Sequence, residues 1–420
     1  MTPQIRQMIQ TLMQTQGASR PAIIAYQHSL LEKLCRHARA HVPLYRDSGR
    51  LDALFRDEVF NMSGWNDVPV LSRAEAYVER DRLRADDVSP VMLPLTEGST
   101  TGSTGTPLPF LRSELSRIVA EGILARALIW YGCGVMNPVV VSKAVTGDVA
   151  GRESAGTLAA HDGPVHQLDF VLPPAVQCAE LARIGPRLVI SYPSIVHSWV
   201  LADGGACLND VVAIVLTGET CRDEVREGIR AVYGGHLINL YSASEAGPIA
   251  IQGPKGDLKV CEENVWLEDP PAATRARPHP VIVTPFYSYG TPLIRYAPGD
   301  YAVFGKPDPA TPGLRSLQAI TGRLRNMFKR PDGSLFWPNL SGAKMMKIAL
   351  HTHRQLVQET LERFVLRIVF DAAPDDGQVA RLKAHVAEVT GAREVVVEAV
   401  AFISDDRTRG KSYENFICLI

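Results

Sequence analysis

The sequence has few of the features expected of a disulfide-bonded or zinc-binding protein. Only seven of its 420 residues are cysteine, with no Cys-x-x-Cys pair and no histidine nearby at zinc-finger spacing. Structural disulfides and a zinc site are therefore not expected, and most of these thiols are expected to be small core residues. The cysteines are at positions 35, 133, 178, 207, 221, 261 and 418.

Long apolar runs and an excess of one charge are also missing. No segment reaches the roughly 18 apolar residues of a membrane-spanning helix, and Met1–Arg20 lacks the continuous apolar core of a signal peptide. Lys and Arg number 44 and Asp and Glu 45, which gives a formal net charge of -1. Without a surplus of cations, nucleic-acid binding is not expected. We predict a soluble cytoplasmic protein with neither nucleic acid nor membrane among its partners.

The sequence does contain enough apolar residues for a large folded core. Hydrophobic residues make up 46% and charged residues 21%, which are ordinary values for globular proteins. From Thr2 to Arg46, apolar residues recur at helical spacing, with a break at Gly17–Pro21. From about residue 93 to residue 301, short β-branched runs alternate with helix-like segments, which predicts an α/β fold with a largely parallel sheet. The predicted strands include 138–142, 187–191, 211–216 and 236–240.

The remainder of the chain is predicted to form a compact α+β unit of its own. Strands are predicted at 364–370 and 394–398, and a helix between them at 376–389. Because 420 residues exceed what one hydrophobic core usually holds, we predict two domains. The large N-terminal domain would comprise residues 1–324 and the small C-terminal domain residues 325–420.

Ser, Thr and Gly are most concentrated in Thr96–Pro107. Its glycines allow tight turns, and its hydroxyls beside exposed backbone amides can cradle phosphate oxygens. No Gly-Lys-Ser/Thr sequence ends the stretch, so it is not a Walker A loop. On these residues alone, a phosphate cradle and a flexible linker are equally supported.

Polar residues follow two later β-like runs. Tyr241 and Glu245 come just after the predicted strand 236–240, at the edge where open α/β sheets hold ligands. Tyr241 can stack on a base and Glu245 can hold a magnesium ion, although such a glutamate is more often an ordinary helix-start carboxylate. Asp300 can accept both hydroxyls of a ribose and Arg323 can support the sugar or a phosphate. The alternative for these two is a turn-capping aspartate and a solvated arginine.

In this order and spacing, these segments resemble the adenylate-forming superfamily, and in particular the group of phenylacetate–coenzyme A ligases and coenzyme F390 synthetases. His41–Arg46 and Trp65–Ser72 resemble that group's N-terminal signature, so the resemblance covers nearly the whole chain. It implies a large multi-layer α/β adenylation domain and a small mobile C-terminal lid domain. It also implies ATP-dependent activation of a carboxylic acid, of the aryl class, as an acyl-adenylate, followed by transfer to a thiol. ATP, Mg²⁺ and coenzyme A are the implied cofactors and co-substrate.

The resemblance assigns roles to individual residues by position. Glu245 would hold magnesium, and Lys411 would be the catalytic lysine that bridges the acid's carboxylate and the α-phosphate. Residues near the motifs are candidates for the walls of the acid pocket, namely Tyr131, Ala243 and Gly247. The nucleotide-binding residues implied are Thr100, Thr101, Gly102, Ser103, Thr104, Gly105, Gly218, Glu219, Tyr241, Ser242, Asp300 and Arg323.

Some positions depart from the group's pattern. Thr106 stands where the loop usually has Lys, Arg325 replaces the hinge Asp, and Glu414 replaces an Arg that often follows the catalytic Lys. They favour an alternative: a protein that adenylates an acid, or binds an adenylate, without coenzyme A transfer, or that loads a carrier protein. A homodimer is compatible with the resemblance.

Overall fold

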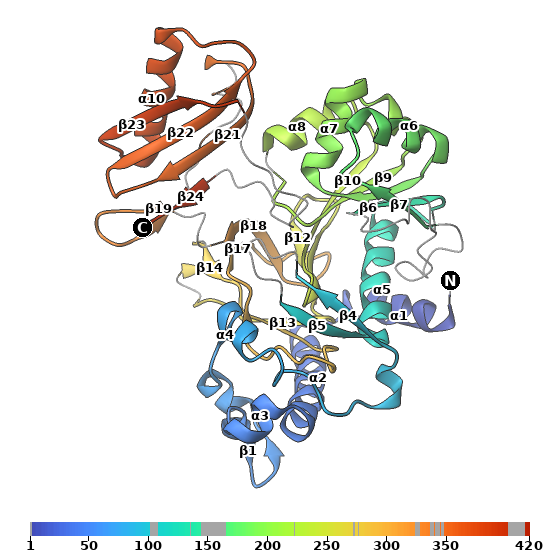
Figure 1. The fold of residues 1–420 in the computed structure, drawn as a ribbon. Helices are drawn as coiled ribbons and strands as arrows, with labels where there is room; N and C mark the ends of the chain where they lie inside the picture. Colours follow the sequence, from blue (N-terminus) through green and yellow to red (C-terminus); the bar gives the residue numbers. More distant parts are fainter. Residues whose placement is uncertain are drawn as a thin grey trace. The chain divides into compact units, whose positions relative to one another are not determined.

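The computed structural model describes most of the chain and divides it into two compact units. The larger unit comprises Met1–Cys221 and Val225–Ile320, and the smaller unit comprises Arg222–Glu224 and Thr321–Ile420. Each unit is described by itself (Figure 1). The described residues are 2–100, 108–134, 136–143, 165–221, 223–271, 274–275, 277–323, 328–336, 340, 345, 348–401 and 416–420.

The larger unit begins with the helices predicted between Thr2 and Arg46. Thr2 and Ser19 cap α1 and α2, and a proline follows each cap within two residues, which starts the helices there. The predicted break between them is confirmed at Gln16–Ser19. The helices of this unit are α1 (Pro3–Thr15), α2 (Arg20–His41), α3 (Pro43–Ser48), α4 (Arg73–Val78), α5 (Glu114–Trp130), α6 (Pro174–Ile184), α7 (Pro193–Asp203) and α8 (Asp223–Arg230), with 3-10 helices η1 (Asp52–Leu54), η2 (Met62–Asp67), η3 (Pro90–Met92) and η4 (Ala206–Leu208).

Most strands of the larger unit belong to one sheet, in the order β14-β17-β18-β12-β11-β10-β9-β8-β6-β7. The strands are β1 (Phe55–Arg56), β2 (Val59–Phe60), β3 (Leu71–Ser72), β4 (Leu95–Ser99), β5 (Pro109–Ser113), β6 (Val139–Lys143), β7 (Val165–Asp169), β8 (Leu188–Ser191), β9 (Ala213–Leu216), β10 (His236–Ala243), β11 (Gly247–Gln252), β12 (Leu258–Val260), β13 (Val265–Leu267), β14 (His279–Pro280), β15 (Val283–Pro285), β16 (Tyr296–Ala297), β17 (Asp300–Phe304) and β18 (Ser316–Arg323).

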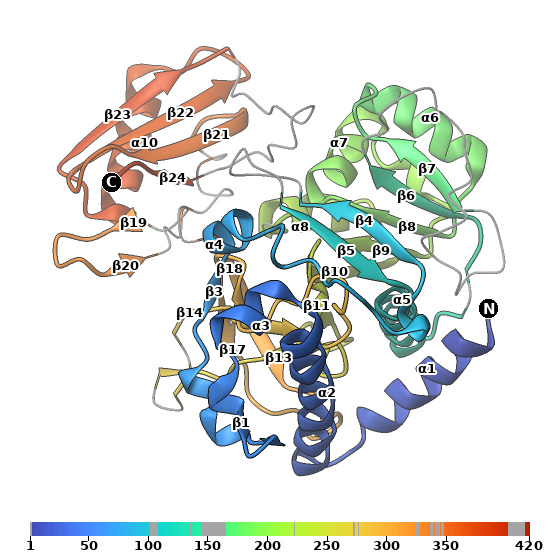
Figure 2. The ribbon, with the colours of Figure 1, turned by 60° about the horizontal axis from the view of Figure 1, so that its bottom comes forward.

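The predicted parallel part of this sheet is confirmed. The strands β7, β6, β8, β9 and β10 pair in parallel in that order, and β11 then pairs with β10 in the antiparallel sense. Alternate residues of the parallel strands face two different cores: Val139 and Val215 pack with α5, whereas Val140 and Ile214 pack with α6, α7 and α8. Figures 1 and 2 show these helices on opposite faces of the strands. Burial on both faces explains the continuous apolar runs in the sequence.

The smaller unit contains a four-stranded sheet in the order β23-β22-β21-β24. The helix and the two strands predicted here are confirmed within two residues, and Asp375 caps the helix in a reciprocal capping box with Gln378. Its elements are β19 (Phe328–Lys329), β20 (Leu335–Phe336), β21 (His351–Gln358), β22 (Arg363–Phe370), α10 (Asp376–Thr390), β23 (Glu394–Ala399) and β24 (Phe416–Cys418). Among the described residues of either unit, no helix combines the length and hydropathy that crossing a membrane requires.

Candidate active site

The turn between β10 and β11 carries five of the residues singled out in the sequence. They follow one another along the strand end and the turn: Tyr241, Ser242, Ala243, Glu245 and Gly247. The pairing of the two strands is irregular between the first two of these residues, and the last pairs with Ala243 across the turn. This turn lies at the carboxyl end of β10, beside the carboxyl end of its parallel neighbour β9. That is the edge at which open α/β sheets bind ligands.

A buried asparagine holds this turn in shape. The Asn264 side-chain amide donates hydrogen bonds to the backbone oxygens of Ala246 (3.1 Å) and Pro248 (2.8 Å). Gly247, between them, has a φ of +72°, a conformation that residues with a Cβ rarely adopt. The position of Glu245 is therefore set by a glycine-dependent turn and an amide clamp.

Glu245 is buried and has two polar partners on one carboxylate oxygen. The Tyr296 hydroxyl donates to Oε1 at 2.6 Å, and Nη1 of Arg73 lies 3.3 Å from the same atom. The Glu245 side chain is 3% exposed and that of Arg73 is 15% exposed. Burial, reinforced by the Glu245 charge, raises the pKa of the Tyr296 hydroxyl, so this group remains a proton donor.

The same arginine reaches the base of the hydroxyl-rich loop. Arg73 Nη2 donates to the Thr100 hydroxyl at 2.7 Å. Thr100 is paired with Leu108 across the loop: the Thr100 amide donates to the Leu108 carbonyl, and the Leu108 amide donates to the Thr100 hydroxyl at 2.9 Å. The base of the predicted phosphate loop is therefore joined to Glu245 by one guanidinium group.

Local pairing explains why Arg73 lies there. Strand β3 runs parallel to β16, with Leu71 opposite Tyr296 and Ser72 opposite Ala297. Ser72 then caps α4 by accepting a hydrogen bond from the Glu75 amide, which makes Arg73 the first residue of that helix. Arg73 is thus fixed next to the strand that carries Tyr296.

A second contact joins the turn to the predicted ribose-binding residue. The Tyr241 hydroxyl donates to Oδ2 of Asp300 at 2.9 Å. Asp300 opens β17 directly after Gly299, whose φ is +95°. The structure therefore brings Tyr241 and Asp300 together, although they are far apart in the sequence.

The end of β9 completes this edge of the sheet. The hydroxyls of Thr217 and Ser242 lie 3.1 Å apart. Gly218 has a φ of +80°, and a Cβ there would lie 2.4 Å from the Tyr192 ring, so only glycine fits. The Glu219 carboxylate accepts a hydrogen bond from the Ser194 amide at 3.3 Å. The backbone of residues 217–219 consequently follows the strand end at which the turn residues gather.

Tyr131 is not brought to this edge, which corrects the expectation that it lines the same pocket. Its hydroxyl donates to the carbonyls of Gln252 and Gly253, and its ring centroid is 5.2 Å from that of His236. His236 is the first residue of β10, whereas Tyr241 and Ser242 are near its last. Nearness to the motifs in the sequence does not bring Tyr131 to the site, because Tyr131 follows the end of α5 at the opposite edge of the sheet.

Several predicted site residues lie outside the described part of the chain. They are Thr101, Gly102, Ser103, Thr104 and Gly105 of the loop, and Lys411 near the C-terminus. Thr106, Arg325 and Glu414, which depart from the group's pattern, are outside it as well. For Arg323 only the backbone is described, at the end of β18.

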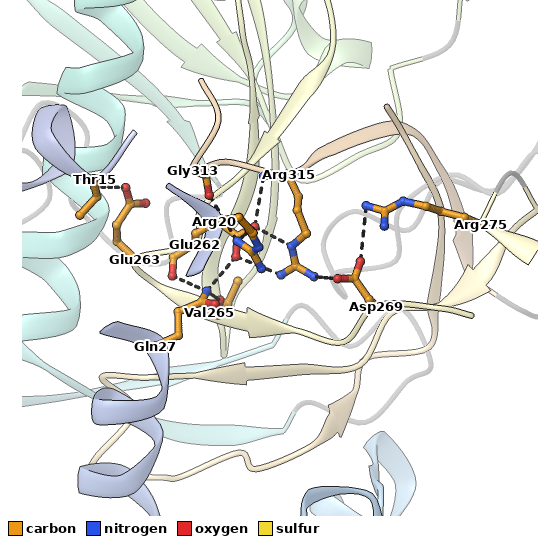
Figure 3. Close-up of polar contacts among 10 residues, drawn as sticks. All are labelled: Thr15, Arg20, Gln27, Glu262, Glu263, Val265, Asp269, Arg275, Gly313 and Arg315. Carbon is orange, nitrogen blue, oxygen red and sulfur yellow. Dashed lines mark hydrogen bonds and ion pairs between the residues drawn. The ribbon is translucent and has the colours of Figure 1, made fainter. Parts of the chain in front are cut away.

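The two residues before Asn264, Glu262 and Glu263, are joined to the N-terminal helices by an ion pair and hydrogen bonds (Figure 3). Glu262 is 0% exposed and contacts Arg315 at 2.6 Å and Arg20 at 3.0 Å. Burial opposes its ionisation, but the charges of Arg315 and Arg20, together with hydrogen bonds from Arg315 and Gln27, outweigh burial and hold the Glu262 pKa below its usual value. Glu263 pairs with the fully buried Arg126 at 2.6 Å. The segment that ends in Asn264 is thereby anchored on both sides.

Sequence reasoning missed Arg73, Tyr296 and Asn264. Arg73 directly follows Trp65–Ser72, and Tyr296 lies in the run that ends at Asp300, so both are next to segments that had been noticed. Asn264 follows two glutamates, a pattern that carries no recognisable motif. For Arg73 and Tyr296, a position beside a recognised segment is the one signal in the sequence. The sequence does not show which side chains they contact.

The donor set around Glu245 fits a magnesium ion held mainly by substrate. Its Oε1 atom is occupied by Tyr296 and Arg73, whereas Oε2 accepts no hydrogen bond from any residue that the structure describes. Magnesium commonly binds one or two protein carboxylates, several waters and substrate phosphates. One free carboxylate oxygen beside the base of a hydroxyl-rich loop satisfies that requirement.

Comparison with solved structures shows the class of fold. The chain matches 2-hydroxyisobutyryl-CoA ligase in the postadenylation state with an acyl-AMP bound, with a TM-score of 0.69 and 18% identity over 90% of this chain and 86% of that one. It also matches o-succinylbenzoate CoA synthetase from Bacillus subtilis in complex with its acyl-adenylate intermediate, with a TM-score of 0.52 and 11% identity over 75% and 66% of the two chains. The protein therefore has the mixed α/β fold of adenylate-forming acyl-CoA ligases.

Sequence comparison gives a more limited match. The chain is 23% identical to Protein CapK of Staphylococcus aureus over 208 residues. This alignment covers 48% of the chain and 46% of CapK, so the chain spans about half the length of that curated relative. No protein-family model matches the sequence.

Proposed function

We propose that the protein uses ATP to activate a carboxylic acid as its acyl-adenylate and then transfers the acyl group to a thiol. The observation that carries this proposal is the linkage of Thr100, Arg73, Glu245 and Tyr296, next to the Tyr241–Asp300 contact at the same sheet edge. Adenylation needs a phosphate-binding loop, a carboxylate that can hold magnesium and a carboxylate that can bind the ribose, all close together.

The chemistry explains why a fixed cation is useful there. A carboxylate that attacks the α-phosphorus of ATP brings several negative charges together, and groups positioned in advance offset that repulsion as the transition state forms. Arg73 presents a guanidinium whose donors already point at Thr100 and Glu245. Since Thr106 replaces the usual loop lysine, we propose that Arg73 supplies part of the missing positive charge.

The adenosine would lie along the strand ends. By resemblance, the backbone of Thr217–Glu219 runs along the adenine, Tyr241 stacks on it and Asp300 accepts the ribose hydroxyls. The Tyr241–Asp300 hydrogen bond supports this, because it orients the carboxylate before the nucleotide binds. Ser242, whose hydroxyl meets Thr217, narrows the space beside the base. Magnesium, when bound at Glu245, would neutralise phosphate charge.

The acid, the acceptor and the catalytic lysine are proposed from resemblance. We propose an aryl acid, and coenzyme A as the thiol, with Lys411 as the cation that bridges the acid and the α-phosphate. Structures of 2-hydroxyisobutyryl-CoA ligase include one with an acyl-AMP and CoA in the thioesterification state, which matches this chain with a TM-score of 0.59 and 18% identity. That ligase acts on an aliphatic hydroxy acid, so the acid panel must include both classes.

The test is release of pyrophosphate from ATP and magnesium in the presence of single acids. At least one acid is expected to stimulate release, and the same acid is expected to form a thioester when coenzyme A is added. Glu245→Gln and Asp300→Asn should lose the activity, while Arg36→Gln, a change on the exposed face of α2, should retain it. If no acid in the panel stimulates release although the chain binds ATP, the proposal fails.

A second candidate function is adenylation, or adenylate binding, without transfer to coenzyme A. It is favoured by Arg325 and Glu414, which replace residues expected around the hinge and the catalytic lysine. This candidate predicts pyrophosphate release with no thioester to coenzyme A, and either acyl transfer to a phosphopantetheine carrier or retention of the adenylate. Measuring thioester formation with each acceptor separates the two functions.

A further inference from the structure

Two cysteines and an aspartate converge beneath the helices that cover one face of the parallel strands. Cys178 comes from α6, Asp203 is the last residue of α7, and Cys207 lies in η4. Their sulfur atoms and a carboxylate oxygen all lie within 4.8 Å of one another. Both thiols are more than nine-tenths buried. No part of the proposed adenylation site involves these residues.

The cysteine on α6 is held rigidly against α7. The neighbouring Gln177 accepts a hydrogen bond from the buried Trp199 indole at 2.8 Å and donates to the Leu172 carbonyl at 2.6 Å. Cys178 Sγ itself lies 3.9 Å from the Trp199 carbonyl oxygen, in the last turn of α7. The separation between Cys178 and the end of α7 is therefore fixed by packing and not by a flexible loop.

The aspartate is oriented by backbone amides. Asp203 accepts from the Gly205 amide at Oδ1 (2.8 Å) and from the Cys207 amide at Oδ2 (2.9 Å). The left-handed conformations of Gly204 and Gly205 let the chain turn back so that both amides reach it. Carboxylates that bind metals are held by hydrogen bonds of this kind. The carbonyl end of α7, which carries partial negative charge, adds to the attraction for a cation.

We propose that Cys178, Asp203 and Cys207 bind one zinc ion, with a water molecule as the fourth ligand. In a tetrahedral zinc site with Zn–S near 2.3 Å and Zn–O near 2.1 Å, ligand atoms are about 3.5–3.8 Å apart, so the observed cluster needs only a small contraction. Thiolates select zinc over magnesium or calcium, which prefer oxygen ligands. On binding, each thiol releases its proton to solvent, and no oxidation or other covalent step is needed.

The ion would tie together three elements that no disulfide joins. All the cysteines of the chain are free thiols in the structure, and α6, α7 and η4 meet in the second hydrophobic core. A bound ion would stabilise this layer because it binds the folded arrangement and not the unfolded chain. The sequence does not predict this site, since the three proposed ligands follow none of the usual zinc-binding spacings.

The experiment measures zinc on the full chain under reducing conditions. The protein is stripped with chelator, mixed with a slight excess of zinc, separated from free metal by gel filtration and analysed for bound metal; cobalt substitution then reports thiolate ligation by its sulfur-to-cobalt absorption. The variants are Cys178→Ser, Cys207→Ser and Asp203→Asn. The matched control is Cys133→Ser, because Cys133 is 8% exposed, as is Cys207, but lies outside the cluster.

We expect one zinc per chain in the wild type and in the control, and at least a hundredfold weaker binding in the three variants. Zinc at about 100 times its dissociation constant should raise the folding equilibrium constant of the wild type about a hundredfold, and it should not do so for Asp203→Asn. Asparagine keeps an acceptor oxygen for only one of the two backbone amides, because its NH2 group cannot accept a hydrogen bond. Urea unfolding in chelator therefore shows first that each variant folds, and zinc binding is compared among the variants that do. A wild type that retains no zinc, or an Asp203→Asn protein that binds like the wild type, would overturn the proposal.

Discussion

The buried Arg73–Glu245 pair makes the sharpest prediction about the proposed adenylation site. At 3.3 Å, unit charges in a medium of effective dielectric constant near 20 attract by roughly 5 kcal/mol, before the cost of their desolvation is subtracted. Removing one partner leaves the other charge buried. We therefore expect Arg73→Met to lower the free energy of unfolding by about 3 kcal/mol, and Glu245→Gln to lower it by a smaller amount because the amide still accepts from Tyr296.

The double variant should be more stable than the sum of the two single changes predicts, by about 1–3 kcal/mol. The assay is urea unfolding followed by tryptophan fluorescence. It reports mainly on the larger unit, which contains four of the five tryptophans.

The control cycle uses Arg36 and Glu32, an exposed pair on α2 at 2.8 Å with side chains 43% and 41% exposed. Its coupling should stay below about 0.5 kcal/mol. A coupling free energy near zero in both double-mutant cycles would refute the claim that Arg73 and Glu245 stabilise each other as a buried pair.

Three further predictions follow from the surroundings of the site. Tyr296→Phe should lower the unfolding free energy by about 1.5–3 kcal/mol and the rate of pyrophosphate release about 10–100-fold, whereas Tyr45→Phe, another buried tyrosine, should leave the rate within about twofold when corrected for the folded fraction; equal rate losses would contradict this. Asn264→Ala should raise KM for ATP, since the turn that carries Glu245 loses both hydrogen bonds from the Asn264 amide. Asn264→Asp should have a similarly raised KM, because a carboxylate donates no hydrogen bond. A wild-type KM in Asn264→Asp would show that the amide does not hold the turn. The Glu262 pKa is lowered on folding, so the contribution of Glu262 to stability is complete above its unfolded pKa of about 4.3 and is lost as pH falls below that value. The urea midpoint of the wild type should therefore decrease below about pH 5, and that of Glu262→Gln should decrease less steeply. Equal slopes of urea midpoint against pH in the two proteins would refute this.

Much of the fold could be predicted from the sequence because its local signals agree with its packing. Strands β6, β8 and β9 appear in the sequence as β-branched runs, and their bounds agree with the predicted ones within two residues. Strand β10 continues three residues beyond its predicted end, and β7 is not among the predicted strands. The first helices begin at Ser or Thr caps followed by proline, which is a local signal as well. Such features depend on residues close together in the chain, which is where pattern reasoning is strong.

The partners of single polar residues could not be predicted in this way. Arg73 meets Thr100 and Glu245, which are 27 and 172 residues further along the chain, and it is one of many arginines in its region. Cys178 and Cys207 follow no metal-binding spacing, yet the packing of α6 against α7 and η4 brings them together. Nearness to the motifs in the sequence predicts Tyr131 as a pocket residue, but Tyr131 lies beside the first residue of β10 and Tyr241 is near the other end of that strand. In all three cases the position of the side chain depends on contacts between residues that are far apart in the sequence.

The central claim is that the β10–β11 turn, Asp300 and the base of the hydroxyl-rich loop bind one nucleotide. Native mass spectrometry of the full chain with ATP, magnesium and the acid panel tests it directly. The account predicts that the wild type gains the mass of one acyl-adenylate for at least one acid, and that Asp300→Asn and Glu245→Gln do not. Retention of the same adenylate by both variants at the wild-type level would contradict it.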